Sequence, residues 1–251
     1  NAVVVSECAG GWFVSAQVEQ EIEEPTLSTG EIIGVDLGIS TLATLSDGTT
    51  FENPQALRKA ERKLKRIQRE LSRRKKGSSN REKSRRKLAK THAKIANIRK
   101  HALHQITHYL TAKTKPYKVV IEDLNVSGMV KNHSLAKSIS DASFSEFRRQ
   151  LEYKGLWNGV KIEVADRFYP STKTCSVCGN VKESMLLSER TFRCTECGFE
   201  CNRDLNAAIN LAEYAEPKHD SSACGVGVHQ CATVKQEASK VKFTQISLAN
   251  P

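Results

Sequence analysis

The chain has 251 residues, with 39 Lys and Arg against 28 Asp and Glu, a formal net charge of +11, and only 6% aromatic residues. Its longest apolar runs are strand-sized, far short of the roughly 20 residues that a membrane-spanning helix needs, so an integral membrane protein is excluded. The N-terminus has neither Met nor a charged segment ahead of an apolar stretch. We therefore expect Asn1 to be a cut end, no signal peptide, and a cytoplasmic location.

The first predicted elements of the body are two strands. Residues 31–36 form an apolar run that ends at Asp36, and residues 41–45 alternate in hydrophobicity before a Ser-Asp-Gly turn. Apolar runs bounded by turn residues are typical of strands. The pattern predicts a β-hairpin with a carboxylate at the end of its first strand.

A long basic helical hairpin is predicted over residues 57–111. Apolar residues recur there at spacings of three and four, in one seam that includes Ile67 and Ile98, and a Gly-Ser-Ser-Asn turn interrupts them. Within it, residues 58–100 hold 20 Lys and Arg against three acids, a local balance of +17, which leaves −6 for the rest of the chain. Such a concentration favours a polyanion as partner, because cations near phosphates release condensed counterions.

The basic side chains lie away from the apolar seam, where they can follow a phosphate backbone without reading base edges, so the contact should be independent of sequence. The alternatives are a solvated charge run, or calmodulin or acidic lipid bound by basic amphipathic helices. We predict nucleic-acid binding by the cations at and after the turn, which are Arg73, Arg74, Lys75, Lys76, Arg81, Arg85, Arg86 and Lys87.

The remaining elements predict an α/β fold. Residues 117–122 read as a buried strand that ends at Glu122, residues 143–157 as a helix and residues 160–164 as a strand. A short last helix over residues 202–214 carries an acid in its first turn. This order of elements indicates a mixed sheet covered by helices.

Three acids, Asp36, Glu122 and Asp204, each lie at the end of a predicted element. If the strands that end at Asp36 and Glu122 are neighbours, these two acids project from one sheet edge, and the last helix can add Asp204. Clustered carboxylates repel one another unless a hard cation neutralises them, and Mg²⁺ prefers oxygen ligands. The chemistry favoured is a two-metal phosphodiesterase, with ions about 3.5–4 Å apart. Taken singly, each acid also has an ordinary explanation, as a turn acid, a solvated strand end or an acid favoured by a helix dipole.

Two Cys-x2-Cys pairs give the strongest local signal. Cys175 with Cys178 and Cys194 with Cys197 are separated by fifteen residues, and a Gly follows each pair. This spacing is typical of a four-thiolate zinc site, which has no open position and is therefore structural. Two disulfides in a secreted protein are the alternative, which the lack of a signal peptide disfavours. Cys201 is surplus to a tetrahedral site.

Four segments, at residues 34–48, 119–129, 165–179 and 192–212, resemble the RuvC-type nuclease core and zinc ribbon of TnpB, the transposon-encoded OrfB family related to type V CRISPR effectors. By this resemblance the fold is RNase H-like, Asp36, Glu122 and Asp204 are the catalytic acids that hold two Mg²⁺ ions, and the four cysteines bind one structural Zn²⁺.

The resemblance also implies a domain organisation. It gives the last strands of a wedge-like β-barrel (1–28), a RuvC-like nuclease core (29–170) containing the basic helical hairpin (57–111), a zinc ribbon (171–202), the last core helix (203–215) and a mostly irregular tail (216–251). Because only the end of the barrel is expected, recognition of a target-flanking motif should be missing or supplied by another segment.

The activity implied is that of an RNA-guided DNA endonuclease, or its nuclease half, with a guide RNA and target DNA as partners. In such a system, base pairing in an RNA–DNA heteroduplex supplies the sequence specificity. This agrees with a basic hairpin that binds only the shape and the phosphate backbone of the nucleic acid. Two rival interpretations remain: a guide-RNA-dependent DNA-binding repressor that does not cut, and a transposase proper, which also uses three acids.

Overall fold

The structure is a computed structural model that describes residues 2–18, 24–186 and 188–214. The described residues fall into two separate units, one that holds residues 2–18 and one that holds residues 24–214. The predicted irregular tail lies outside the described residues. No helix in the described ranges combines the length and apolarity that crossing a bilayer requires.

The described part of the first unit is an antiparallel hairpin of β1 (Val3–Cys8) and β2 (Gly11–Ala16). Ala9 and Gly10 connect the strands with φ angles of 52° and 81°. Two successive residues at positive φ are the geometry of the tight turn that matches the twist of a hairpin. The two strands expected near the N-terminus are therefore present, and the barrel to which they would belong remains a prediction.

A five-stranded mixed sheet forms the centre of the second unit. Its order is β5 (Thr50–Glu52), β4 (Thr41–Leu45), β3 (Ile32–Leu37), β6 (Lys118–Glu122) and β7 (Lys161–Ala165). The first three strands pair antiparallel, and β3, β6 and β7 run parallel. The strands that carry Asp36 and Glu122 are therefore neighbours, which is the condition under which their acids were expected to share one sheet edge. Strand β5 was not expected from the sequence.

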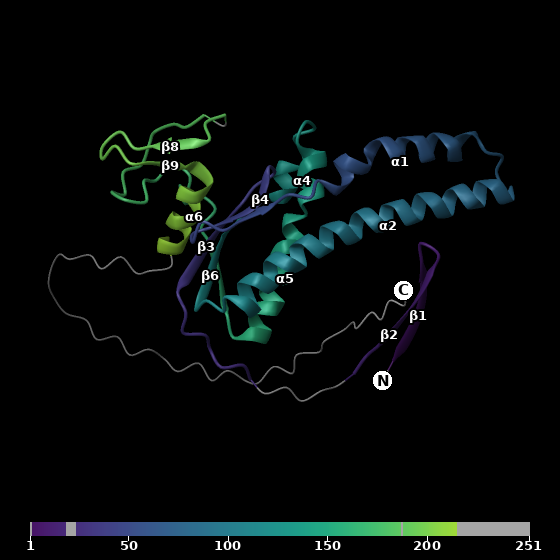
Figure 1. Cartoon of the computed structure of the whole chain (residues 1–251), viewed down its shortest axis with the longest axis horizontal. Coiled ribbons are helices and arrows are strands. Elements are labelled where there is room, and N and C mark those ends of the chain that lie inside the picture. Colours follow the sequence, from purple (N-terminus) through teal and green to yellow (C-terminus); the bar gives the residue numbers. More distant parts are fainter. Residues whose placement is uncertain (1, 19–23, 187, 215–251) are drawn as a thin grey trace. The chain divides into compact units, whose positions relative to one another are not determined.

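Helices cover both faces of this sheet (Figure 1). On one face α2 (Ser79–His108), α4 (Ala136–Ala142) and α5 (Phe144–Asn158) bury the main apolar core, to which the strands contribute Ile33, Val35, Val119 and Ile121. On the other face α6 (Arg203–Tyr214) packs Leu211 against Val120 and Ala165. Alternation along the strands explains why successive residues serve different faces.

Gly34 sets how closely α6 approaches the sheet. A Cβ at this position would lie 2.0 Å from the carbonyl oxygen of Ala208 and 2.5 Å from the nitrogen of Ala212, so only glycine fits. Close packing of helix and strand backbones at this point positions the first turn of α6 over the end of β3.

The predicted helical hairpin consists of α1 (Ala56–Arg73) and α2, joined by the expected turn (Figure 1). Ile67 is fully buried, as the seam predicted, but Ile98 is 39% exposed. That assignment was wrong, because the apolar side chains further along α2, Leu103 and Ile106, face the sheet core instead of α1.

The base of the hairpin is tied to the core by Asp141 of α4. Its buried carboxylate accepts the backbone N–H of Leu57 at 3.0 and 3.1 Å and lies 3.4 Å from the Arg99 guanidinium. It therefore satisfies an N–H in the first turn of α1 that has no partner within the helix. The short α3 (Val126–Met129), α4 and a π-helical turn after α2 (Tyr109–Lys113) had no clear sequence signal.

Candidate functional site

The three predicted acids come together at one end of the sheet. Val35 pairs with Ile121, so Asp36 and Glu122 are the next residues along two adjacent parallel strands. Both follow Gly34 and Val120 by two positions, which places them on the face that α6 covers. Asp204 precedes Ala208 by about one helical turn, roughly the 6 Å that separates Asp36 from Gly34 along the strand. The negative charge of Asp204 acts on Asp36, so α6 runs toward this end of the sheet and brings Asp204 to the level of Asp36.

The pKa of Asp36 reflects this proximity. Burial raises the pKa of Asp36 well above its ordinary value, and the negative charges of Glu122 and Asp204 raise it further, whereas Arg203 lowers it. The Arg203 guanidinium lies 3.3 Å from an Asp204 carboxylate oxygen and supplies part of the compensating charge. A cluster of partly buried carboxylates with this residual repulsion fits a divalent cation.

The carboxylates are neighbours but do not form one tight ligand set. Among the residues that the structure describes, the four cysteines alone form a group of three or more metal-ligating side chains close enough to hold a single ion. Two ions about 3.5–4 Å apart would be shared among spread carboxylates rather than held at one point. The oxygen donors of Asp36, Glu122 and Asp204 thus suit Mg²⁺ by chemistry, and their roles remain a prediction.

A loop that sequence reasoning missed connects this site to the cysteines. Ser171 donates its hydroxyl to Glu122 Oε1 at 2.5 Å. Two fully buried asparagines of α6 hold the same loop, because Asn210 donates to the carbonyls of Ser171 and Thr174 at 2.7 Å and Asn206 to that of Thr174 at 2.6 Å. Buried amides inside an otherwise apolar helix face were the available signal, since burial of such groups needs partners.

The four cysteines converge as the spacing predicted. Their sulfur atoms all lie within 4.8 Å of one another, with Cys175 to Cys197 at 3.7 Å and Cys178 to Cys194 at 3.5 Å. A tetrahedron with Zn–S bonds of about 2.3 Å has edges of about 3.8 Å, so the thiolates fit one zinc ion. Within the cluster, backbone N–H groups of Cys197 and Glu196 help to lower the pKa of Cys194 to about 6, whereas burial and neighbouring thiols raise the pKa values of Cys178 and Cys197. Several thiolates this close together need a cation to neutralise them.

Each cysteine pair lies on a knuckle of the same construction. Cys175 donates its N–H to Asn180 and Cys194 donates to Phe199, both at 2.8 Å, across loops closed by a Gly with φ near +70°. The second knuckle connects β8 (Thr191–Arg193) to β9 (Glu200–Asn202). Cys201 is outside the sulfur cluster, and burial raises its pKa, so it is surplus as expected.

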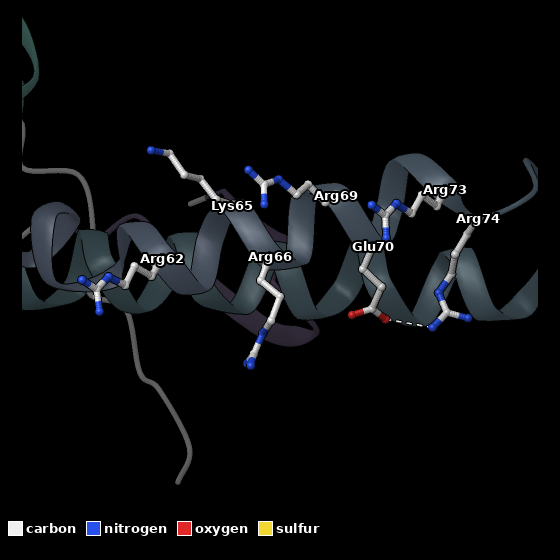
Figure 2. Close-up of a pocket in the computed structure, with 7 residues that line it drawn as sticks. All are labelled: Arg62, Lys65, Arg66, Arg69, Glu70, Arg73 and Arg74. Carbon is white, nitrogen blue, oxygen red and sulfur yellow. Dashed lines mark hydrogen bonds and ion pairs between the residues drawn. The ribbon is translucent and has the colours of Figure 1, made fainter.

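The basic hairpin presents a cationic surface along α1. A groove there is lined by six cations and one acid from successive turns of the helix, shown in Figure 2, which are Arg62, Lys65, Arg66, Arg69, Glu70, Arg73 and Arg74. Arg62, Arg66, Arg69 and Arg73 follow spacings of three and four and so form a stripe roughly 16 Å long. All four residues lie in α1, before the turn, and the sequence prediction named only Arg73 among them.

Some of the predicted nucleic-acid-binding cations already have partners. Arg81 donates to the carbonyls of Leu71 and Arg74 at 2.8 and 3.1 Å and so closes the turn. Four other predicted cations form ion pairs with acids, and such exposed pairs contribute little to stability. They join Arg74 to Glu70 at 2.9 Å, Lys87 to Glu70 at 3.9 Å, and Arg85 and Arg86 to Glu82 at 2.7 and 3.2 Å. Arg73, Lys75 and Lys76 take part in none of the ion pairs found among the described residues.

Two known families match separate parts of the chain. The OrfB_IS605 family, described as "Probable transposase", matches residues 15–133, and the Cas12f1-like TNB domain matches residues 144–211. The chain belongs to the TnpB (OrfB) family. It is 38% identical to InsQ of Escherichia coli K12, a protein named as a candidate RNA-guided DNA endonuclease, over 95% of this chain and 62% of that protein.

Other relatives of this TnpB-family chain agree. A candidate RNA-guided DNA endonuclease of Streptomyces pristinaespiralis is 42% identical over 91% of the chain and 55% of its own length. Cas12f1 of Sulfoacidibacillus thermotolerans, named as a CRISPR-associated endodeoxyribonuclease, is 24% identical over 80% of the chain and 50% of its own length. The chain therefore spans about half to three fifths of the curated relatives it matches.

Solved structures confirm the fold of the TnpB-family chain. A CRISPR-Cas12f ternary complex superposes with a TM-score of 0.54 at 20% identity, over 82% of this chain and 45% of that one. A Cas12f1–sgRNA–target DNA complex gives 0.52 at 17% identity, over 84% and 55%. The expected RNase H-like mixed α/β fold, with its inserted hairpin and a ribbon fitted for zinc, is thus confirmed.

Proposed function

We propose that this chain is the nuclease part of a transposon-encoded, RNA-guided DNA endonuclease, and that it hydrolyses DNA phosphodiester bonds with Asp36, Glu122 and Asp204 as its catalytic acids. The observation that carries the proposal is the proximity of these three carboxylates at the end of β3 and β6, by the first turn of α6. Guide RNA and target DNA are the proposed partners, by relation to the complexes and endonucleases named above.

The three acids would hold two Mg²⁺ ions, which supply activation of water and neutralisation of charge on the scissile phosphate. Asp36 is central, since both other carboxylates raise its pKa. Ser171 fixes one oxygen of Glu122, and Asn202 accepts the N–H groups of Asp204 and Leu205 at 2.9 and 3.1 Å, which fixes the start of α6. The four cysteines would hold one structural Zn²⁺ that keeps this arrangement rigid.

The direct test is Mg²⁺-dependent cleavage of labelled single-stranded DNA by the chain and by Asp36→Ala. We expect the variant to lose at least a hundredfold in rate, because removal of one carboxylate leaves the divalent site incomplete. Glu52→Gln, an exposed acid of the edge strand β5, is the control and should cut at the parent rate. Cleavage by Asp36→Ala at the parent rate would refute the catalytic assignment.

A second candidate function is strand transfer, which the description of the OrfB_IS605 family as a transposase family favours. Both reactions break a phosphodiester bond, but transfer joins the freed 3′ end to a second DNA molecule. Sequencing the products separates them, since hydrolysis leaves only free ends.

A further inference from the structure

A groove beside Glu122 has no role so far. Its lining comes from the ends of β3 and β6, from α3 and α5, and from the segment after β7, and it includes Glu122, Arg148, Arg149 and Arg167. Asp123 holds two of these cations together, because it pairs with Arg167 and lies 3.3 Å from Arg148. Both guanidinium groups remain about half exposed, with donors available to a ligand.

Phe168, next to Arg167 in the chain, is the most exposed large hydrophobic side chain among the described residues, at 87%. Hydrogen bonds hold the backbone on which it stands. Its N–H donates to Asp166 Oδ1 at 2.8 Å, and Tyr169 donates its N–H to the Asp166 carbonyl at 3.0 Å. The hydroxyl of Tyr169 donates to the Asn210 carbonyl at 3.0 Å, and its ring packs edge-on against Tyr214.

The turn over residues 166–168 therefore holds an aromatic ring in solvent. Its place in the fold is close to the proposed catalytic acids, because β7 ends at Ala165, the register partner of Glu122. An exposed aromatic ring beside an arginine is the combination with which proteins hold single-stranded nucleic acid: the ring stacks on a base and the cation binds a phosphate.

We propose that Phe168 is a stacking platform for an unpaired base of the DNA strand presented to Asp36, Glu122 and Asp204, and that Arg167 binds the phosphate of that strand. This inference rests on the proposed nuclease function and deepens it, because it makes a single strand the form of DNA that reaches the acids. Stacking requires an exposed base face, which a paired base in a duplex does not offer.

The test measures binding apart from cleavage. Single-stranded DNA that carries one 2-aminopurine is titrated with the Asp36→Asn chain, in which the strand stays intact, and with the same chain carrying Phe168→Ala or Phe168→Trp. Stacking on the ring quenches 2-aminopurine fluorescence. We expect Phe168→Ala to bind about tenfold more weakly and to lose the quenching, and Phe168→Trp to retain both.

Two controls make the result specific. Leu156→Ala, a change at another exposed apolar side chain, 70% accessible on α5, should leave binding unchanged. Duplex affinity should be the same for Phe168→Ala and its parent. Unchanged affinity and quenching for Phe168→Ala, or an equal loss for single strand and duplex, would overturn the stacking role. Absence of cleavage by the unsubstituted chain with intact quenching would instead refute the nuclease function and leave the strand site standing.

Discussion

At the scale of single residues, Asp36 combines a proposed catalytic role with a cost in stability. Its pKa is raised by burial and by two neighbouring carboxylates, so the folded state holds its proton more tightly than the unfolded chain does. An acid with a raised folded-state pKa destabilises the fold once the pH exceeds its ordinary pKa near 3.9, and the loss grows until the pH passes the folded-state pKa. Without a divalent cation, Asp36 therefore destabilises the fold at neutral pH.

The variant Asp36→Asn should consequently be more stable than the parent in metal-free buffer at pH 7. We expect its melting temperature to rise by a few degrees, at about 2–4 °C per kcal/mol for a chain of this size. The difference should shrink as the pH falls and disappear below about pH 3, where the parent carboxylate is protonated in both states. Thermal unfolding at several pH values measures it, with Glu52→Gln as the control.

The same thermal unfolding can be measured with Mg²⁺ added. A cation that binds only the folded parent should raise the parent's melting temperature and leave Asp36→Asn little changed. A melting temperature for Asp36→Asn below that of the parent at pH 7 would show that the carboxylate stabilises the fold, contrary to this account.

At the scale of elements, the basic stripe on α1 is a candidate backbone-tracking surface. Neutralising it should weaken nucleic-acid binding and flatten the salt dependence, by about 0.9 in the logarithmic slope for each duplex phosphate that the protein no longer neutralises. The measurement is affinity for duplex DNA over a range of salt concentrations. The variant carries Gln in place of each residue of the stripe, namely Arg62, Arg66, Arg69 and Arg73.

Replacing the same four arginines by lysine gives the matched control, because charge is retained and only the guanidinium geometry is removed. That control should keep most of the slope. A slope in the Gln variant equal to that of the parent would refute the role of the stripe. Arg81 is left unchanged in both variants, since it closes the turn of the hairpin.

The elements themselves show what sequence reasoning could and could not reach. The strands that carry Asp36 and Glu122, the basic hairpin and the cysteine knuckles follow from local periodicity and spacing, and the structure has them, although β3 ends one residue later than predicted, at Leu37. Ile98 was misassigned because a helix of 30 residues changes partners along its length, from α1 to the sheet core, and periodicity does not name the partner. Ser171 and Asn210 were missed because their roles depend on hydrogen bonds across the fold.

At the scale of the whole second unit, the zinc ribbon is directly connected to the proposed catalytic site. β9 ends at Asn202 and α6 begins at the next residue, so the ribbon leads directly into the helix that carries Asp204. Asn206 binds the first knuckle from the other side, accepting the Ser176 N–H at 3.1 Å while donating to Thr174. A well-ordered set of four cysteines should therefore keep Asp204 in a fixed position beside the other two acids.

Removal of zinc should loosen residues 171–202 and the first turns of α6, because a four-thiolate site stabilises a ribbon with little core of its own. We expect faster amide hydrogen exchange in both segments and reduced cleavage even with Mg²⁺ in excess. Cys178→Ser should reproduce the effect of chelation, and Cys201→Ser, outside the sulfur cluster, should match the parent. Zinc added back should restore the parent but not Cys178→Ser. Full cleavage and unchanged exchange in α6 after verified loss of zinc would show instead that the sheet alone orders Asp204, through the close packing of α6 at Gly34.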